Sequence, residues 1–270
     1  MESEIKDLHR KCELLKALHV PGEPLVLPNA WDVGSARMVV EAGYPVVATT
    51  SMGVAASIGF ADHEGAPSEE MFAVAGRICG GVEVPVTVDA EAGYGLDAAT
   101  FVAALRRIGA AGCNLEDTDH ATRRQRDPGD QAEWIAAVRS AAAAVQYPLV
   151  INARIDNYLA EFVARLHSGE TGPAPQQQHL ADVVDRAHRY LAAGADCAYP
   201  ITLHQPDQIS ALARETAGLI NLSWMPHGLA LAELADLGVA RISYGGLLWS
   251  QTMSKRYADR FRAELADRLR

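Results

Sequence analysis

This chain alternates short apolar strands with helices, and that alternation constrains its fold more than any other feature of the sequence. The predicted strands cover residues 25–27, 45–50, 84–89, 112–116, 149–153, 197–201, 219–222 and 241–244. A predicted helix follows each strand; the one after the first strand has Asp32 as its expected N-cap, and the one after the fourth strand is expected from about residue 131. Strict alternation of this kind is typical of a parallel sheet covered by helices. Eight such units in a chain of 270 residues predict a closed (β/α)8 TIM barrel.

An open, doubly wound sheet is the alternative that the same alternation allows. It is disfavoured because no GxGxxG sequence follows the first strand. Residues 3–18 carry apolar side chains at near-helical spacing, so we expect an extra N-terminal helix before the repeat. Residues 167–178 form the only linker-like stretch, and we interpret them as a surface insertion. We therefore expect residues 1–270 to form one barrel domain.

Composition and charge argue against several classes of partner. The net charge of −10 is opposite to the basic footprint of a nucleic-acid-binding protein. No apolar run approaches the roughly 20 residues that span a membrane, and the charged N-terminus has no apolar signal segment. The four cysteines are scattered without a CxxC pair, which is typical of reduced thiols. We therefore expect a cytoplasmic protein that binds neither nucleic acid nor a membrane.

The stretch VTVDAEAGYG at residues 86–95 places Asp89 and Glu91 at the end of the third predicted strand. Because side chains i and i+2 of a strand share a face, both carboxylates point the same way if the extended geometry lasts to Glu91. Crowded carboxylates repel unless a cation or a shared proton relieves them. Oxygen ligands of this kind suit Mg²⁺. A strand that ends in a solvated acidic turn is the alternative.

Other predicted strands also end in charged or polar residues. These residues are Glu116 and Asp117 after the fourth strand, Arg154 and Asp156 after the fifth, and Ser51 and Asp62 in the loop after the second. Active sites of such barrels lie at the carboxyl ends of the strands, so we expect one charged mouth there. We interpret residues 51–65 as a loop, and residues 117–130, which hold few apolar anchors, as a lid that is mobile without ligand.

At these residues the chain resembles the isocitrate lyase/phosphoenolpyruvate mutase superfamily. The resemblance rests on NAWDVGSAR at 29–37, TTSMGVAASIGFADHEG at 49–65, VDAEAGYG at 88–95, NLED at 114–117 and INARIDNY at 151–158. It covers nearly the whole chain in order. It implies a (β/α)8 barrel that binds Mg²⁺, with Mn²⁺ as the alternative ion. The implied chemistry breaks or forms a C–C or P–C bond next to a 2-oxo carboxylate.

The resemblance also implies roles for individual residues. Asp89 is the implied principal metal ligand, and Glu91 and Glu116 hold metal-bound waters. Arg154 and Asp62 are the implied catalytic residues, and Arg154 contacts the substrate. The implied substrate-binding set comprises Trp31, Ser51, Met52, Gly53 and Arg154, with the substrate carboxylate held largely by backbone N–H groups of residues 51–53.

The eighth helix is implied to exchange between barrels, which makes a homo-oligomer, either a dimer or a tetramer, the expected assembly. An apolar stripe on the last predicted helix agrees with this expectation. The stripe comprises Leu247, Leu248, Trp249, Met253, Tyr257 and Phe261. Such a stripe must pack on something, and packing on the chain's own barrel is the alternative to exchange.

The predicted lid departs from the family pattern. The lyases that the chain resembles carry a KKCGH loop whose cysteine acts as the general acid, and the mutases and phosphonopyruvate hydrolases place a lysine there. Here residues 119–124 read DHATRR, with neither. His120 is a candidate acid or base, and Arg123, Arg124 and Arg126 are candidate electrostatic substitutes; a solvated basic lid is the alternative.

The expected function is a Mg²⁺-dependent lyase that acts on a small 2-oxo or 2-hydroxy dicarboxylate through an enolate, as an oxaloacetate decarboxylase does. The missing cysteine and lysine favour this function, or a non-catalytic barrel, over P–C chemistry. Two alternatives remain. One is P–C chemistry of the phosphoenolpyruvate mutase or phosphonopyruvate hydrolase type. The other is a non-catalytic barrel that binds a 2-oxo acid.

Overall fold

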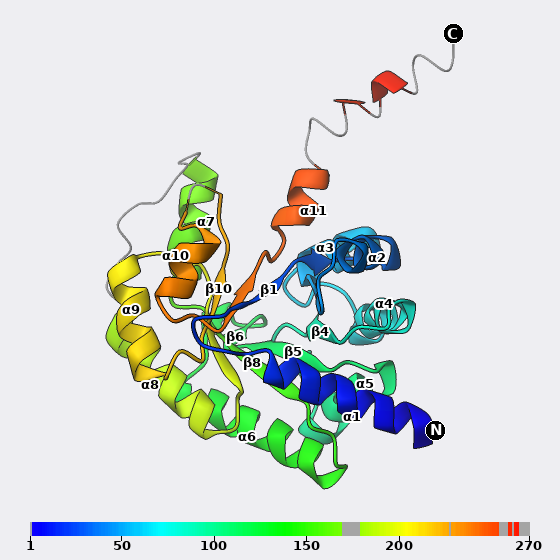
Figure 1. Ribbon diagram of the computed structural model, residues 1–270, viewed down its shortest axis with the longest axis horizontal. Coiled ribbons are helices and arrows are strands. Elements are labelled where there is room, and N and C mark those ends of the chain that lie inside the picture. Colours follow the sequence, from blue (N-terminus) through cyan, green and yellow to red (C-terminus); the bar gives the residue numbers. More distant parts are fainter. Residues whose placement is uncertain (1, 169–178, 227, 254–258, 261, 265–270) are drawn as a thin grey trace.

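The structure, a computed structural model, describes residues 2–168, 179–226, 228–253, 259–260 and 262–264 (Figure 1). Within these residues, parallel strands close into a ring, which confirms the predicted (β/α)8 barrel. Six strands lie in the order β2 (Asn29–Ala30), β3 (Val47–Thr49), β4 (Val86–Asp89), β5 (Gly112–Glu116), β8 (Val150–Ile155) and β9 (Cys197–Pro200). Three more lie in the order β1 (Leu25–Leu27), β11 (Arg241–Ser243) and β10 (Asn221–Ser223).

Two connections turn these sheets into one barrel. β1 and β2 follow each other along one strand position, and a parallel bridge between Ala198 and Ile220 joins β9 to β10. The described strands therefore occupy one position for each of the predicted units. In the pairing of neighbouring strands, Asp89 lies opposite Asn114, and Glu116 lies opposite Arg154. These charged side chains thus leave the barrel at the same, carboxyl-terminal end.

Helices cover the outside of the barrel, as Figure 1 shows. Those that follow the strands as predicted are α2 (Val33–Glu41), α4 (Ser68–Gly81), α5 (Ala98–Ile108), α6 (Pro128–Ala144), α8 (Leu180–Ala192), α9 (Pro206–Glu215), α10 (Leu231–Asp236) and α11 (Leu247–Thr252). Capping residues explain two of the starts. The side chain of Asp32 accepts the N–H of Ser35 at 2.7 Å in a capping box, so the predicted N-cap of α2 is confirmed. Asp127 caps α6, whose first residue is Pro128, and this helix begins earlier than the predicted residue 131.

The predicted N-terminal helix is α1 (Glu2–Ala17), and it lies across the amino-terminal ends of the strands. Leu15 is fully buried there. A Cβ on Gly112, the first residue of β5, would lie only 2.8 Å from Cδ2 of Leu15, so this glycine permits the close approach. Nζ of Lys16 pairs with Asp196 at 2.8 Å. The helix therefore closes the end of the barrel opposite the acidic mouth.

Three segments differ from the predictions. The predicted loop 51–65 begins as a helix, α3 (Ser51–Ser57), in which Val54 and Ala55 are buried against the barrel. The predicted lid contains an antiparallel hairpin of β6 (Thr118–Asp119) and β7 (Arg124–Gln125). A helix that was not predicted, α7 (Leu159–Ser168), follows β8, and residues 169–178 of the predicted insertion lie outside the described residues. α3 and the two strands of the hairpin are too short for a periodic pattern to identify them.

The final helix, α11, begins on its own barrel and points away from it (Figure 1). At its start, Gly246 and Trp249 lie close to Met52 and Gly53 of α3. Its side chains from Leu247 to Trp249 are only half-buried. The predicted apolar stripe continues to Tyr257 and Phe261, which lie outside the described residues. None of the helices in the described parts of the chain combines the length and the apolar character that crossing a bilayer requires.

Candidate active site

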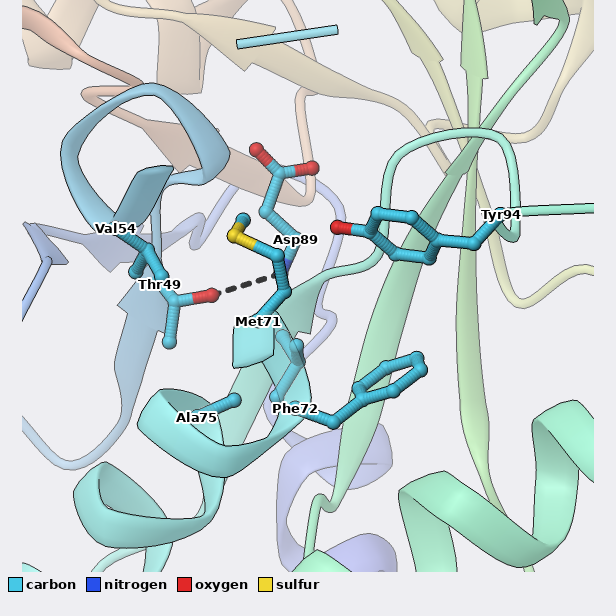
Figure 2. Close-up of a pocket in the computed structure, with 8 residues that line it drawn as sticks. Thr49, Val54, Met71, Phe72, Ala75, Asp89 and Tyr94 are labelled. Carbon is cyan, nitrogen blue, oxygen red and sulfur yellow. Dashed lines mark hydrogen bonds between the residues drawn. The ribbon is translucent and has the colours of Figure 1, made fainter. Parts of the chain in front are cut away.

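The candidate site is built around Asp89, the last residue of β4. The N–H of Asp89 donates to Oγ1 of Thr49 at 2.8 Å, the bond drawn in Figure 2, and its Oδ2 accepts the N–H of Ser51 at 3.0 Å. A small and largely apolar pocket lies against it, lined by Thr49, Val54, Met71, Phe72, Ala75, Val88, Asp89 and Tyr94. These contacts hold the carboxylate at the end of the strand without neutralising its charge.

Two buried carboxylate oxygens at this mouth have no hydrogen-bond donor within the described part of the chain. They are Oδ1 of Asp89 and Oδ1 of Asp62, which lies in the loop after α3. The charges of both residues act on Glu91 and Glu116, so the four acids form one cluster. Buried polar atoms without a partner are rare, because burial removes their hydration. The open oxygens fit a hard divalent cation, which takes oxygen ligands.

Glu91 does not reach this cluster by continuing the strand. β4 ends at Asp89, and Glu91 has a φ of 48°, so the alignment of the two side chains by strand alternation is not found. Instead, Oε2 of the buried Glu91 accepts the N–H of Glu64 at 2.5 Å, and Oε1 accepts the hydroxyl of Tyr94 at 2.8 Å. Burial, and then the charge of Asp89, raises the pKa of Glu91 to about 8. A carboxyl group crowded in this way would be relieved by a cation.

Glu116 is buried at the end of β5 between a guanidinium and an imidazole. Its Oε2 pairs with Arg154, and its Oε1 lies 2.5 Å from Nε2 of His120. Burial raises the pKa of Glu116, and the guanidinium of Arg154 opposes that shift. Arg154 also donates from Nε to Oδ1 of Asp156 at 2.6 Å and from Nη2 to Oδ2 at 3.1 Å. Two carboxylates therefore hold Arg154 in place at the mouth.

Asp117 belongs to a different network, although the sequence places it beside Glu116. Its side chain is fully buried, and its Oδ2 accepts the hydroxyl of Tyr190 at 2.8 Å and Nη1 of Arg186 at 3.0 Å. It also accepts Nε2 of Gln125 from the hairpin at 3.0 Å. Burial raises the pKa of Asp117 to about 6, although Arg186 opposes the shift. Asp117 thus anchors the hairpin to α8 and is not one of the acids of the mouth.

His63 is a residue of the mouth that the sequence prediction did not include. Its ring centroid lies 5.3 Å from that of His120, which the hairpin segment carries. Together with Glu116 these histidines form a group whose ligand atoms all lie within 4.8 Å of one another, so a candidate metal site exists here. The segment ADHEG at 61–65 holds His63 beside Asp62, and that proximity was the available signal.

The predicted substrate-binding residues lie around the first turn of α3. Ser51, Met52 and Gly53 begin this helix, and the N–H of Ser51 is already used by Asp89. Trp31 is half-buried and packs on Gly53, where an added Cβ would lie 2.8 Å from Cβ of Trp31. The structure thus places these residues next to Asp89, while substrate contacts remain a prediction.

Comparison with known proteins agrees with this architecture. The family model described as phosphoenolpyruvate phosphomutase matches residues 15–262. A crystal structure of a putative phosphonomutase from Burkholderia cenocepacia superimposes with a TM-score of 0.83 at 38% identity, covering 93% of this chain and 99% of that one. An uncharacterized protein of Mycobacterium tuberculosis is 33% identical over 233 residues, which are 86% of this chain and 82% of the relative.

Relatives with named activities are more distant and differ in reaction. A probable 2-methylisocitrate lyase from Corynebacterium glutamicum is 30% identical over 86% of this chain and 70% of its own length. An oxaloacetate decarboxylase from Pseudomonas fluorescens is 28% identical over 81% of this chain and 72% of its own length. The match to the family model covers nearly the whole barrel, including every acid of the mouth. This chain therefore belongs to the phosphoenolpyruvate phosphomutase family of the isocitrate lyase/phosphoenolpyruvate mutase superfamily.

Proposed function

We propose that this chain is a Mg²⁺-dependent carbon–carbon lyase that acts on a small 2-oxo or 2-hydroxy dicarboxylate, with oxaloacetate decarboxylation as the expected reaction. One observation supports the proposal most. Asp62 and Asp89 each leave a buried oxygen without a donor in the described structure, inside a cluster that also contains Glu91 and Glu116. Oxygen donors of this kind suit Mg²⁺, and also Mn²⁺.

In this proposal Asp89 would bind the ion directly, and Glu91 and Glu116 would hold its waters. When bound, the ion would supply Lewis-acid stabilisation of the negative charge that develops on the 2-oxo oxygen. Arg154 would bind the substrate, because its guanidinium is fixed by Glu116 and Asp156 and keeps further N–H donors. Its fixed position means that little conformational entropy is lost when the substrate binds.

The rest of the proposed substrate site lies on α3 and the loop after it. Of residues 51–53, Met52 and Gly53 would hold a substrate carboxylate through their backbone N–H groups, since the first N–H groups of a helix have no partner within it. The N–H of Ser51 instead donates to Asp89. Trp31 would form one wall of the site, and Asp62 would lie beside the reacting bond. This arrangement would bring substrate and ion next to each other at the end of β4.

The lid determines which reactions the site can complete. Residues 117–130 contain no cysteine and no lysine, so no thiol is available there to protonate a departing enolate in an isocitrate-type cleavage. Loss of CO₂ is less demanding, because water can protonate the enolate that it leaves. We therefore expect measurable oxaloacetate decarboxylation and little or no cleavage of isocitrate or 2-methylisocitrate.

P–C chemistry is the second candidate function. The similarity to a putative phosphonomutase at 38% identity favours it, while the absence of a lysine from residues 119–124 disfavours it. A barrel that binds a 2-oxo acid without turning it over is the third candidate function.

We further propose that residues 1–270 form one domain and that the chain is a homo-oligomer. Its four buried, unpaired cysteines support a reducing, cytoplasmic location.

A substrate panel with purified full-length protein distinguishes these functions. We expect Mg²⁺-dependent release of pyruvate from oxaloacetate above the uncatalysed background, abolished by a chelator and restored by added Mg²⁺. Phosphate release from phosphonopyruvate would favour P–C chemistry instead. Tight binding of 2-oxo acids without turnover would favour the non-catalytic barrel. Robust glyoxylate production from isocitrate would contradict our expectation that a lid without a cysteine does not support isocitrate cleavage.

A further inference from the structure

We infer that His63, Glu116 and His120 form a second metal site, which takes a first-row transition ion such as Zn²⁺ or Co²⁺ in preference to Mg²⁺. Their potential ligand atoms all lie within 4.8 Å of one another. They come from three separate segments: the loop after α3, the end of β5 and the hairpin segment after β5. The inference does not depend on which reaction the mouth catalyses.

The chemistry of the donors separates this site from the cluster around Asp89. Two imidazole nitrogens and one carboxylate suit ions of intermediate softness, such as Zn²⁺, Co²⁺ and Fe²⁺. Mg²⁺ instead prefers oxygen ligands and keeps several of its waters. Asp62, Asp89 and Glu91 offer only oxygens. The mouth therefore contains two sets of donors that prefer different ions, and Glu116 belongs to both sets.

The backbone around His63 indicates that its position is imposed by the fold. His63 and Glu64 are consecutive left-handed residues, with φ of 67° and 56°. Conformations of this kind are unfavourable for residues other than glycine and persist only where the surroundings enforce them. Here Glu64 enforces them, because its N–H donates to Glu91 at 2.5 Å and its Oε1 accepts the N–H of Tyr94 at 2.5 Å. The strained turn places His63 beside His120.

The other two ligands are also held by their surroundings. Arg154 pairs with Oε2 of Glu116, which leaves Oε1 directed at Nε2 of His120, 2.5 Å away. An outer partner that orients a carboxylate in this way is typical of metal sites. A bound ion would need these two atoms to separate slightly. His63 is solvent-exposed, so an ion can enter and would keep positions open for water or substrate.

Binding would join two segments across the mouth, the loop after α3 and the hairpin segment. Among the described residues, no backbone hydrogen bond joins the two segments, whereas each is tied to the barrel, the loop through Glu64 and the hairpin segment through Asp117. An ion shared by His63 and His120 would therefore bridge two elements that border the substrate site.

Co²⁺ is the probe for the test, because its visible absorption reports nitrogen ligands directly. Tag-free full-length protein is titrated with Co²⁺ in the presence of a large excess of Mg²⁺. We expect one equivalent to bind with the spectrum of a nitrogen-ligated ion. His63→Gln and His120→Gln should each weaken this binding by more than about 100-fold, beyond the usual cost of losing an outer partner. His188→Gln, on the exposed surface of α8 beside Glu215, is the matched control and should change nothing.

Asp89→Asn separates this inference from the proposed function. It should remove Mg²⁺-dependent turnover and leave the Co²⁺ spectrum intact. If the spectrum survives both His63→Gln and His120→Gln, or is lost in Asp89→Asn, the ion binds at the oxygen cluster and the inference is wrong. Absence of any nitrogen-ligated spectrum in the wild-type protein would mean that His120 and Glu116 form only a hydrogen-bonded pair. His63→Gln changes an exposed side chain, so its folding is not at risk.

Discussion

The N–H of Ser51 donates to Oδ2 of Asp89 at 3.0 Å, which joins the first turn of α3 to the end of β4. The residue predicted to hold the substrate carboxylate and the residue predicted to hold the metal are therefore in direct contact. Oδ1 of the same aspartate has no partner in the described structure. One oxygen of Asp89 is thus used to position it, and the other is free for a ligand.

This division of roles predicts the effect of Asp89→Asn. The amide oxygen can still accept the N–H of Ser51, so the fold should be retained. Removing one of several crowded negative charges should leave the melting temperature unchanged or raise it slightly. Mg²⁺-dependent turnover should be lost, because a direct ligand has lost its charge. Thermal unfolding measures the melting temperature, and a Mg²⁺ titration measures the dependence of turnover on the ion. If the variant depended on Mg²⁺ as the wild-type protein does, Asp89 would not be the ligand.

The contact between α3 and Trp31 predicts that Gly53→Ala is harmful. An added Cβ would lie 2.8 Å from Cβ of Trp31 and 3.1 Å from Cδ1 of Trp249. Alanine favours a helix over glycine by about 1 kcal/mol, but overlap in a packed site costs typically 1–3 kcal/mol. We expect a lower free energy of unfolding and impaired substrate binding. Gly80→Ala in α4, where an added Cβ meets nothing within 4 Å, is the matched control and should stabilise the protein. Equal effects of the two changes would contradict this account.

A buried histidine at the closed end of the barrel predicts acid sensitivity. Nδ1 of His19 donates to the carbonyl of Leu15 at 2.8 Å, so Nε2 is the acceptor that faces Nη1 of Arg241 at 3.5 Å. Burial, and then the charge of Arg241, lowers the pKa of His19 from 6.5 to about 4. Between these two values the unfolded chain binds more protons than the folded one. Stability should therefore fall as the pH is lowered from 6.5 towards 4, by up to about 3 kcal/mol from this residue.

Chemical denaturation of wild-type protein and His19→Gln across this range of pH isolates the effect. The variant lacks the titrating ring, so its stability should depend less steeply on pH than that of the wild-type protein. Parallel curves for the two proteins would mean that His19 is not the group responsible.

The hairpin predicts a role for its exposed arginines in substrate binding. Arg123 and Arg124 are exposed, whereas Arg126 donates from Nη1 to Gln131 at 3.1 Å and from its N–H to the carbonyl of Asp117 at 2.7 Å. Replacing Arg123 and Arg124 with alanine should raise KM more than it lowers kcat, if they only attract the distal carboxylate of the substrate. Arg107→Ala, an exposed change on α5, serves as the charge control. An unchanged KM would indicate that these arginines are only solvated surface residues without a role in substrate binding.

The buried network of Asp117 predicts a large loss of stability. Asp117→Ala would leave Arg186 without the carboxylate that it contacts at 3.0 Å in the interior. Breaking one side of a buried ion pair typically costs about 3–5 kcal/mol. The free energy of unfolding, measured by denaturant, should fall by that order. A loss of less than about 1 kcal/mol would indicate that water replaces the lost partner.

Much of the fold could be predicted, because strands buried on both faces are apolar runs and their helices carry capping signals. The predicted strand 112–116 matches β5, and Asp32 caps α2 as expected. The short elements could not be predicted. α3 and the β6–β7 hairpin are defined by contacts with the barrel and with Asp117, and a window of a few residues does not contain those contacts.

The order of residues is enough to predict the barrel, the family and the acids that gather at one end, because the order of the strands brings their carboxyl ends together. What each acid does depends on contacts that appear only in the folded chain. Glu91 enters the cluster through a left-handed turn, and Asp117, next to Glu116 in sequence, faces Arg186 instead. His63 meets His120 because Glu64 binds Glu91 and Tyr94. These are contacts between distant segments, and the direction of a side chain depends on backbone angles that residue spacing does not specify.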